Sequence, residues 1–450
     1  MLQKFWIELR SSLWFVPAVL VLAAIVVAMG LVELDTNYYE TLRRGEWERF
    51  LASGADGARG MLQAIAASMI TVAGVAFSIT IVTLSLASTQ YTPRILRNFM
   101  RDRANQFVLG IFVAVFTYCL VVLRTIRSAG DDGGGGFVPL LAVGFGMLLA
   151  LLSIGCLIYF IHHIAASIQA STILKSITEE TLAAIELLFP ENLGDSAETL
   201  DVVPPPQHVQ WHPVDANATG YLQNINSDRL MQWADKRRSL LRLECSPGDF
   251  VHDGTVLFAS AVALEDSALT TLRSFFVIGD FRTVEQDTLF GIRQIVDIAL
   301  KALSPGVNDT NTAVSCLDYL GAILHRLAHR QFGSPFRAQD GELRVIAATP
   351  VFAEFVANGF DEIRHSAGGN VTILSQLQRI IARIAAATSD RERLDNLLTH
   401  ARLAAELADR SIDTDYDRAK VNTRIAETRL ALRVTALELP ALRPLREQAK

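Results

Sequence analysis

The fold is decided by residues 61–88, MLQAIAASMITVAGVAFSITIVTLSLAS. This stretch is long and apolar enough to cross a lipid bilayer as one helix, which takes about 20 residues. Its hydroxyl residues Thr71, Ser78 and Ser85 recur at every seventh position, so they share one face of that helix. A polar stripe on an apolar span is better placed against other helices or a water-filled path than against lipid. The stretch therefore predicts an integral membrane protein and is the best lead to its function.

The rest of the chain divides into an apolar first part and a mixed-charge second part. Four apolar stretches, at 13–34, 61–88, 107–123 and 137–161, predict four membrane-spanning helices. The fold class predicted is mostly α, with a four-helix transmembrane domain followed by a cytoplasmic α+β domain. We expect the transmembrane domain at 1–165, a helical connector at 166–201, a small β-rich module at 202–280, a helical bundle at 281–440 and a frayed tail at 441–450.

Charge after the second span predicts the orientation. Arg94, Arg97, Arg101 and Arg103 lie within ten residues, opposed by the single acid Asp102. Positive charge of this density stays on the cytoplasmic side of a membrane. Both termini and the second half of the chain are therefore expected in the cytoplasm, and residues 35–59 and 128–136 outside it.

Composition argues against several classes of function. A net charge of −6 makes nucleic acid an improbable partner. The four cysteines show no paired spacing, so no disulfide framework or metal site is expected. His325 and His329 have the spacing of a metal-binding face but lack a third ligand nearby. No short catalytic motif is present, so we expect neither an enzyme nor a cofactor. No charged residue lies in the middle of a span, which argues against an ion-coupled carrier.

The hydroxyl stripe allows two interpretations. It can serve helix packing, since small and hydroxylated residues let membrane helices approach closely. It can instead line a pore between several copies, with Phe77 in a hydrophobic constriction and the four arginines around the inner mouth. The pore-lining candidates are Ser68, Thr71, Gly74, Phe77, Ser78 and Ser85.

A second candidate site lies in the soluble half. Apolar residues at intervals of three and four predict a helix ending at Ser304, and Asp309 or Thr310 can cap the next helix. The candidate residues for a ligand site at this elbow are Asp287, Arg293, Asp297, Ser304, Asn308 and Asp309. Capping alone accounts for several of them, and Arg293 and Asp297 stand four residues apart and can form an ion pair.

Two motifs carry a family resemblance. Residues 88–106, STQYTPRILRNFMRDRANQ, and 290–309, FGIRQIVDIALKALSPGVND, resemble a bacterial family of predicted membrane proteins, domain of unknown function 2254. The likeness covers nearly the whole chain. It implies placement in a bacterial inner membrane and gives no reaction. One departure is Thr310, where the family pattern leads us to expect proline.

The sequence thus predicts an oligomeric, channel-like inner-membrane protein. The second span lines the path, and the cytoplasmic domain assembles or gates it. Its partners would be the lipid bilayer, further copies of the same chain and permeating ions. The alternative is a membrane-anchored scaffold or ligand sensor without transport activity, whose elbow at 304–310 receives a ligand or partner.

Overall fold

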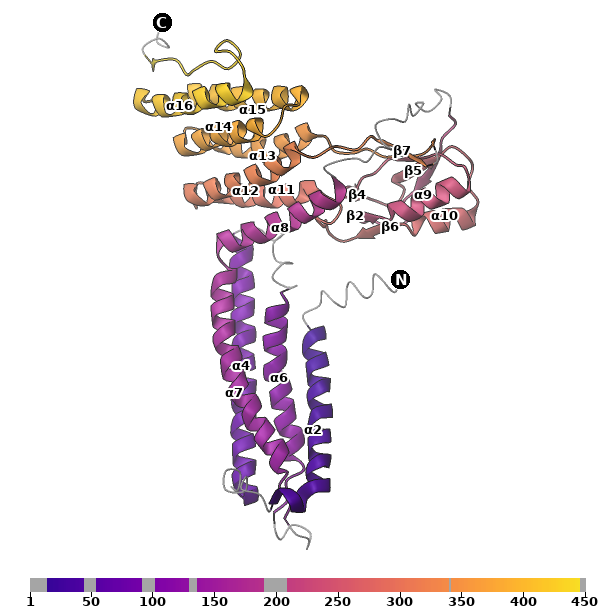
Figure 1. The fold of residues 1–450 in the computed structure, drawn as a ribbon, viewed down its shortest axis with the longest axis vertical. Helices are drawn as coiled ribbons and strands as arrows, with labels where there is room; N and C mark the ends of the chain where they lie inside the picture. The colour runs from indigo at the N-terminus through magenta and orange to yellow at the C-terminus, as the bar shows by residue number, and fades with distance from the viewer. Residues whose placement is uncertain are drawn as a thin grey trace. The chain divides into compact units, whose positions relative to one another are not determined.

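The computed structural model describes residues 14–43, 54–90, 102–128, 136–189, 209–339 and 341–445. They form two compact units that divide between Thr172 and Ile173. The N-terminal unit holds long apolar helices, and the C-terminal unit combines two small sheets with stacked helices (Figure 1). The mostly α class with an added α+β region, predicted from the sequence, is confirmed.

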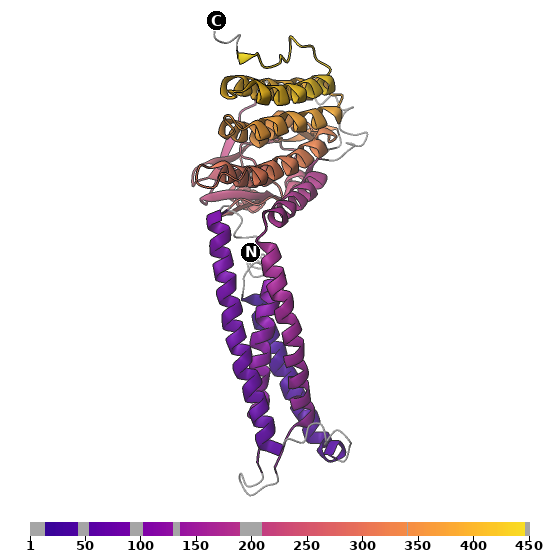
Figure 2. The same ribbon diagram turned by 90° about the vertical axis from the view of Figure 1, so that its left-hand side faces the viewer.

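Four helices of the N-terminal unit are long and apolar enough to cross a membrane. They run alongside one another in two perpendicular views (Figure 1, Figure 2), and α6 packs against each of the other three. Helix α6 is therefore the centre of the bundle. The bounds are Phe15–Arg43 for α2, Gly54–Gln90 for α4, Arg103–Leu123 for α6 and Leu140–Ser167 for α7.

Glycines let the bundle helices approach closely. A β-carbon added at Gly110 of α6 would lie 2.6 Å from a methyl carbon of Leu20 on α2. One added at Gly146 of α7 would lie 3.1 Å from a methyl carbon of Leu62 and 3.4 Å from the ring of Tyr118. Contacts this close leave no room for a larger side chain, as is usual at membrane helix interfaces.

A buried carboxyl group caps the first turn of α7. The N-cap residue of α7 is Pro139, whose side chain cannot accept a hydrogen bond. Asp35 of α2 takes over this role, because its two carboxyl oxygens accept from the backbone N–H groups of Leu141 and Ala142 at 3.0 and 2.9 Å. The hydroxyl of Tyr118 on α6 donates to the carbonyl of Ala142 at 2.7 Å. One turn of α7 is thereby tied to both α2 and α6.

This cap is a role of Asp35 that the sequence does not predict. The first span is predicted to end at residue 34, with residues 35–59 outside the membrane, whereas α2 continues through Asp35 to Arg43. Asp35 is buried, whereas Glu33, two residues earlier on the same helix, is exposed. Local hydropathy cannot distinguish the two acids, since the cap depends on a partner more than 100 residues away.

The C-terminal unit contains two small sheets. One has five strands in the order β1-β5-β3-β8-β7, and the other has three in the order β4-β2-β6. Helices α9 (Ser227–Lys236) and α10 (Asp266–Arg273) contribute Leu230 and Leu272 to the core that the strands bury. The strand bounds are His212–Asp215, Gly220–Ile225, Leu241–Leu243, Phe250–Val251, Val256–Ser260, Phe276–Gly279, Phe336–Gln339 and Glu342–Ile346 for β1 to β8.

The last two strands differ from the sequence prediction. The region 281–440 is expected to be helical throughout, but the hairpin β7-β8 interrupts it and joins the five-stranded sheet. β8 pairs in parallel with β3, where Leu241 is opposite Val345. The Asp-Gly pair at 340–341 is a local hairpin signal for β7 and β8 that the helical prediction overlooks. The pairing of β8 with β3 has no such signal, because the two strands are far apart in sequence.

The remaining helices form stacked antiparallel pairs. The pairs α11-α12, α13-α14 and α15-α16 lie in successive layers (Figure 1), and each pair contacts the next. Helix α8, at Ala170–Leu188, approaches α11 closely, with the Thr181 hydroxyl against Gly291. The bounds are Thr288–Leu303, Thr310–Ala328, Phe352–Ser366, Val371–Ala386, Arg391–Ser411 and Asp415–Leu432 for α11 to α16.

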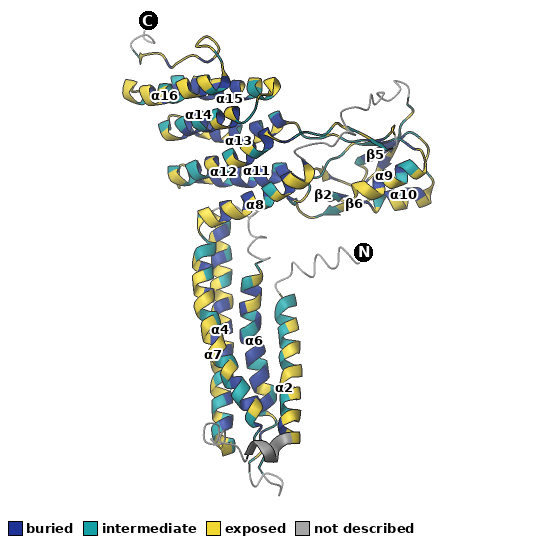
Figure 3. Ribbon diagram, in the orientation of Figure 1, coloured by how far each residue is buried: buried dark blue, intermediate teal, exposed yellow. Residues whose placement is uncertain are grey.

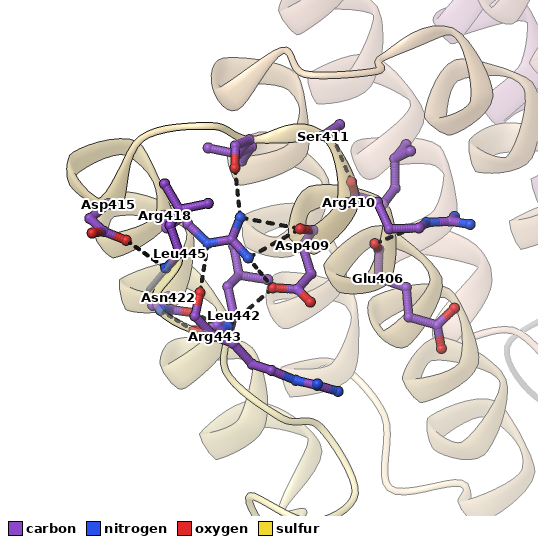
Figure 4. A network of polar contacts seen from close by, with 12 residues as sticks. Glu406, Asp409, Arg410, Ser411, Asp415, Arg418, Asn422, Leu442, Arg443 and Leu445 are labelled. Atoms are coloured by element: carbon purple, nitrogen blue, oxygen red, sulfur yellow. Dashed lines mark hydrogen bonds and ion pairs between the residues drawn. The ribbon is translucent and has the colours of Figure 1, made fainter. Parts of the chain in front are cut away.

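The chain after α16 is held in place up to residue 445, although fraying was expected from residue 441. Buried Arg418 donates to the carbonyls of Arg443 and Ile412 at 2.7 and 2.6 Å and forms an ion pair with Asp409 (Figure 4). Asn422 exchanges two hydrogen bonds with the backbone of Leu442. Leu442 is buried with Leu439, so this segment covers the outer end of the helical stack.

We predict that Asp35→Ala destabilises the N-terminal unit. It leaves two N–H groups of α7 without their acceptor, which costs roughly 1 to 2 kcal/mol. Thermal unfolding of the full-length protein in detergent should show a lower melting temperature. The matched control is Glu33→Ala at an exposed position of the same helix. Equal melting temperatures for the two variants would contradict the capping role.

Candidate functional site

Helix α4 has two faces of different composition. One side of α4 is buried and the other is exposed (Figure 3). The buried side is made mainly of small apolar residues, and the exposed side carries the predicted stripe. The buried positions are Ala58, Leu62, Ala66, Met69, Ala73, Ala76, Thr83 and Ala87. The exposed positions include all six pore-lining candidates, Ser68, Thr71, Gly74, Phe77, Ser78 and Ser85.

The alanine face explains which way α4 is turned. Alanines spaced three and four residues apart form one continuous strip along the helix, so α4 can pack closely on α6 and α7. Thr83, which lies beside the stripe in sequence, is buried on this alanine side. The hydroxyl stripe consequently points away from the core of its own chain.

The exposed stripe keeps hydrogen-bonding capacity. The Thr71 hydroxyl donates to the carbonyl of Ala67 at 2.8 Å, and the Thr89 hydroxyl donates to the carbonyl of Ser85 at 3.1 Å. Each of these hydroxyl oxygens can still accept a hydrogen bond. A β-carbon added at Gly74 would meet no atom within 4 Å, so the middle of the face is open. Such a surface can bond to another helix or to water.

The predicted cytoplasmic mouth is described only in part. Arg94, Arg97 and Arg101 lie outside the described residues, while Arg103 is the first residue of α6 and is exposed. Its neighbour Asp102 caps α6 through the N–H of Ala104 at 2.9 Å. Asp102 also pairs with His163 of α7, with 2.5 Å between Oδ2 and Nε2.

The second candidate site begins at Asp287. Asp287 caps α11 by accepting from the N–H of Phe290 at 3.1 Å and pairs with Arg282 at 2.7 Å. Gly248 has a φ of 100°, and a β-carbon there would lie 2.3 Å from Asp287 Oδ2, so only glycine fits this turn. Burial raises the pKa of Asp287 and outweighs the opposing effect of Arg282. These contacts give Asp287 a role in joining the turn to α11.

Arg293 and Asp297 form the ion pair expected from their spacing. The Nε of Arg293 lies 2.8 Å from Oδ1 of Asp297, and a second nitrogen pairs with Glu362 of α13. The hydrogen bond that Arg293 donates to Glu362 raises the pKa of Arg293. The pair therefore links α11 to α13.

Ser304, Asn308 and Asp309 belong to the turn between α11 and α12. Ser304 is the C-cap of α11, and Asn308 adopts a left-handed φ of 48°. Asp309 caps α12, accepting from the N–H and the hydroxyl of Thr312 at 3.0 and 2.6 Å. The Thr312 hydroxyl lowers the pKa of Asp309. At Thr310 the hydroxyl accepts from the amide of Asn370 at 3.1 Å, a bond that proline could not make.

The six elbow candidates therefore do not converge on one site. Asp287 lies at the start of α11, the Arg293 pair along its middle, and the other three residues beyond its end. A helix of 16 residues is about 24 Å long, which separates Asp287 from Asp309. The exposed rings of His325 and His329 contact each other, but the described residues contain no group of three side chains able to hold a metal ion.

Comparison with known proteins places the chain in a family. The family described as "Predicted membrane protein (DUF2254)" matches residues 10–383. The chain belongs to this family. The match of DUF2254 covers the four apolar helices and the C-terminal unit as far as α14. The resemblance seen in the two sequence motifs is thereby confirmed.

Relatives of this chain among the curated proteins include uncharacterised proteins of Mycobacterium tuberculosis and Mycobacterium bovis. Each is 35% identical to this chain over 383 residues, which cover 83% of this chain and 73% of the relative. No solved structure matches the chain. The comparisons thus establish a membrane protein family and name no activity.

We predict a pH-dependent stability effect at Asp287. Because burial raises its pKa above the ordinary 3.8, the folded protein binds this proton more tightly than the unfolded chain does. The stabilisation is present at low pH and falls as pH rises from about 3.8 through the raised pKa. Melting temperatures of wild type and Asp287→Asn, measured from about pH 4 to about pH 7, should show wild type losing stability relative to the variant.

The control for this measurement is Asp280→Asn, at an exposed position. If wild type instead gains stability over Asp287→Asn as pH rises, the proposed effect of burial is contradicted. The pairing with Arg282 would then outweigh burial in setting the pKa of Asp287.

Proposed function

We propose that this DUF2254 protein is an oligomeric, channel-like protein in which the exposed face of α4 is shared between copies and lines a narrow path. The observation that supports this proposal is the outward position of Ser68, Thr71, Gly74, Ser78 and Ser85. Among the described residues, packing within the N-terminal unit uses the alanine face of α4, and the hydroxyl face is exposed.

Comparison with α7 supports an interface at this face. The exposed positions of α7 are large and apolar, for example Leu152 and Ile158, as expected of a surface against lipid. The exposed side of α4 also carries large apolar residues such as Ile70 and Val82, but a strip of hydroxyls with Gly74 runs between them. Membrane helices associate through such residues, because small side chains allow close approach and hydroxyls bond across the contact.

A path along this face would have polar and apolar segments. The hydroxyls of Ser78 and Ser85 would contact permeating water or ions, and Phe77, which is 52% exposed, would narrow the path between copies. Arg94, Arg97, Arg101 and Arg103 would surround the mouth and favour anions. With these arginines on the cytoplasmic side of the inner membrane, both termini are cytoplasmic and the C-terminal unit assembles or gates the pore.

The test is ion flux into liposomes that contain the purified full-length protein. Ser78→Leu and Gly74→Leu both add bulk to the proposed path. In Ser78→Leu, the loss of a polar contact worth about 1 to 1.5 kcal/mol corresponds to roughly tenfold lower flux. In Gly74→Leu the added bulk alone should lower the flux. The matched control is Gly155→Leu on α7, since Gly155 and Gly74 are both exposed helix positions with open space around them.

Flux lowered by the α4 variants but not by Gly155→Leu supports the proposal. Absence of flux at any voltage or osmotic load would contradict it and would favour the membrane-anchored scaffold or sensor. If both Gly74→Leu and Ser78→Leu leave the flux unchanged, the path does not run along α4.

A further inference from the structure

An apolar groove opens where α2, α6 and α7 meet within the N-terminal unit. Its volume is about 480 Å³, in the range of sites that hold small molecules. The walls are formed by Val16 of α2, Phe107 and Val108 of α6, and Cys156 and Tyr159 of α7. Val108 is buried at the base, whereas Phe107 and Tyr159 are exposed along the sides. The groove therefore opens on the outer surface of the helix bundle.

One end of the groove carries a positive charge. Arg103 lines it, is exposed and makes no ion pair with another described residue. The nearest acid in the sequence, Asp102, is engaged by His163 and by the N–H of Ala104. His163 in turn stacks on Tyr159, with 5.6 Å between ring centroids. The Asp102 carboxyl group thus already has two hydrogen-bond partners, and Arg103 stays available for an anion.

The position of the groove in the bundle indicates what occupies it. Its walls belong to helices that are apolar enough to span a membrane, so a hydrocarbon chain is the group that matches them. Tyrosine and arginine at one end are typical of the level where a bilayer meets water. A ligand with an apolar chain and an anionic head satisfies both features.

We propose that an anionic phospholipid binds in this groove, with an acyl chain against Val108 and Cys156 and its phosphate at Arg103. The positive charge of Arg103 favours anionic over zwitterionic lipids, and the apolar walls bind the acyl chain of either kind. The apolar walls of this site belong to α2, α6 and α7 and are separate from the exposed face of α4. Arg103 is the one residue shared with the mouth of the proposed pore, and lipid binding is measured without ion flux, so either proposal can fail alone.

The test is native mass spectrometry of delipidated full-length protein, titrated with phosphatidylglycerol or phosphatidylcholine of the same chain length. Wild type should bind phosphatidylglycerol more tightly. Arg103→Gln should weaken phosphatidylglycerol binding about fivefold and leave phosphatidylcholine binding unchanged. Arg124→Gln, at the other end of α6 and also exposed, is the matched control.

A second variant tests the apolar walls. Cys156→Phe places a ring in the groove and should weaken binding of both lipids, whereas Gly155→Phe, at the neighbouring exposed position, should weaken neither. Melting temperatures of the variants check that each is folded. Equal affinity of wild type for the two lipids, or equal losses in Arg103→Gln and Arg124→Gln, would overturn the proposal. So would lipid binding that Cys156→Phe leaves intact while the protein remains folded.

Discussion

The carboxyl group of Asp35, bound to two backbone N–H groups at the start of α7, is the interaction on which the N-terminal unit depends. Backbone polar groups at membrane depth need partners inside the protein, and Pro139 offers none through its side chain. Because Asp35 comes from α2 and Tyr118 from α6, one turn of α7 orders three helices. α4 then fits against this arrangement by its alanine face, and the orientation of its hydroxyl face follows.

The C-terminal unit is held together by a different principle. Each helical pair buries its apolar side against the next pair, as in repeat proteins, so the last pair needs a cover at its outer end. The segment up to residue 445 provides this cover through Leu439 and Leu442, and Arg418 holds it by donating a hydrogen bond to the carbonyl of Arg443. Where the sequence predicts two candidate sites, the elbow residues have mainly structural roles, which leaves α4 as the stronger functional candidate.

The sequence predicts features that depend on local pattern. The four apolar helices, the mostly α class, the Arg293–Asp297 pair and a helix start at Asp309 all follow from spacing within about 20 residues. Features that depend on distant partners were missed, including the cap from Asp35, the β3-β8 pairing and the segment held by Arg418. The hydroxyl stripe was visible in the sequence. Its outward position was not, because that depends on which face α6 and α7 accept.

The central claim is that the exposed hydroxyl face of α4 lies between copies of the chain. Disulfide cross-linking in native membranes tests it most directly, with a single cysteine at Ser78→Cys and the four native cysteines replaced by alanine. We predict a covalent dimer for this protein and none for Ile154→Cys, on the exposed surface of α7. A Ser78→Cys protein that stays monomeric while its thiol reacts with a lipid-soluble reagent would contradict the account.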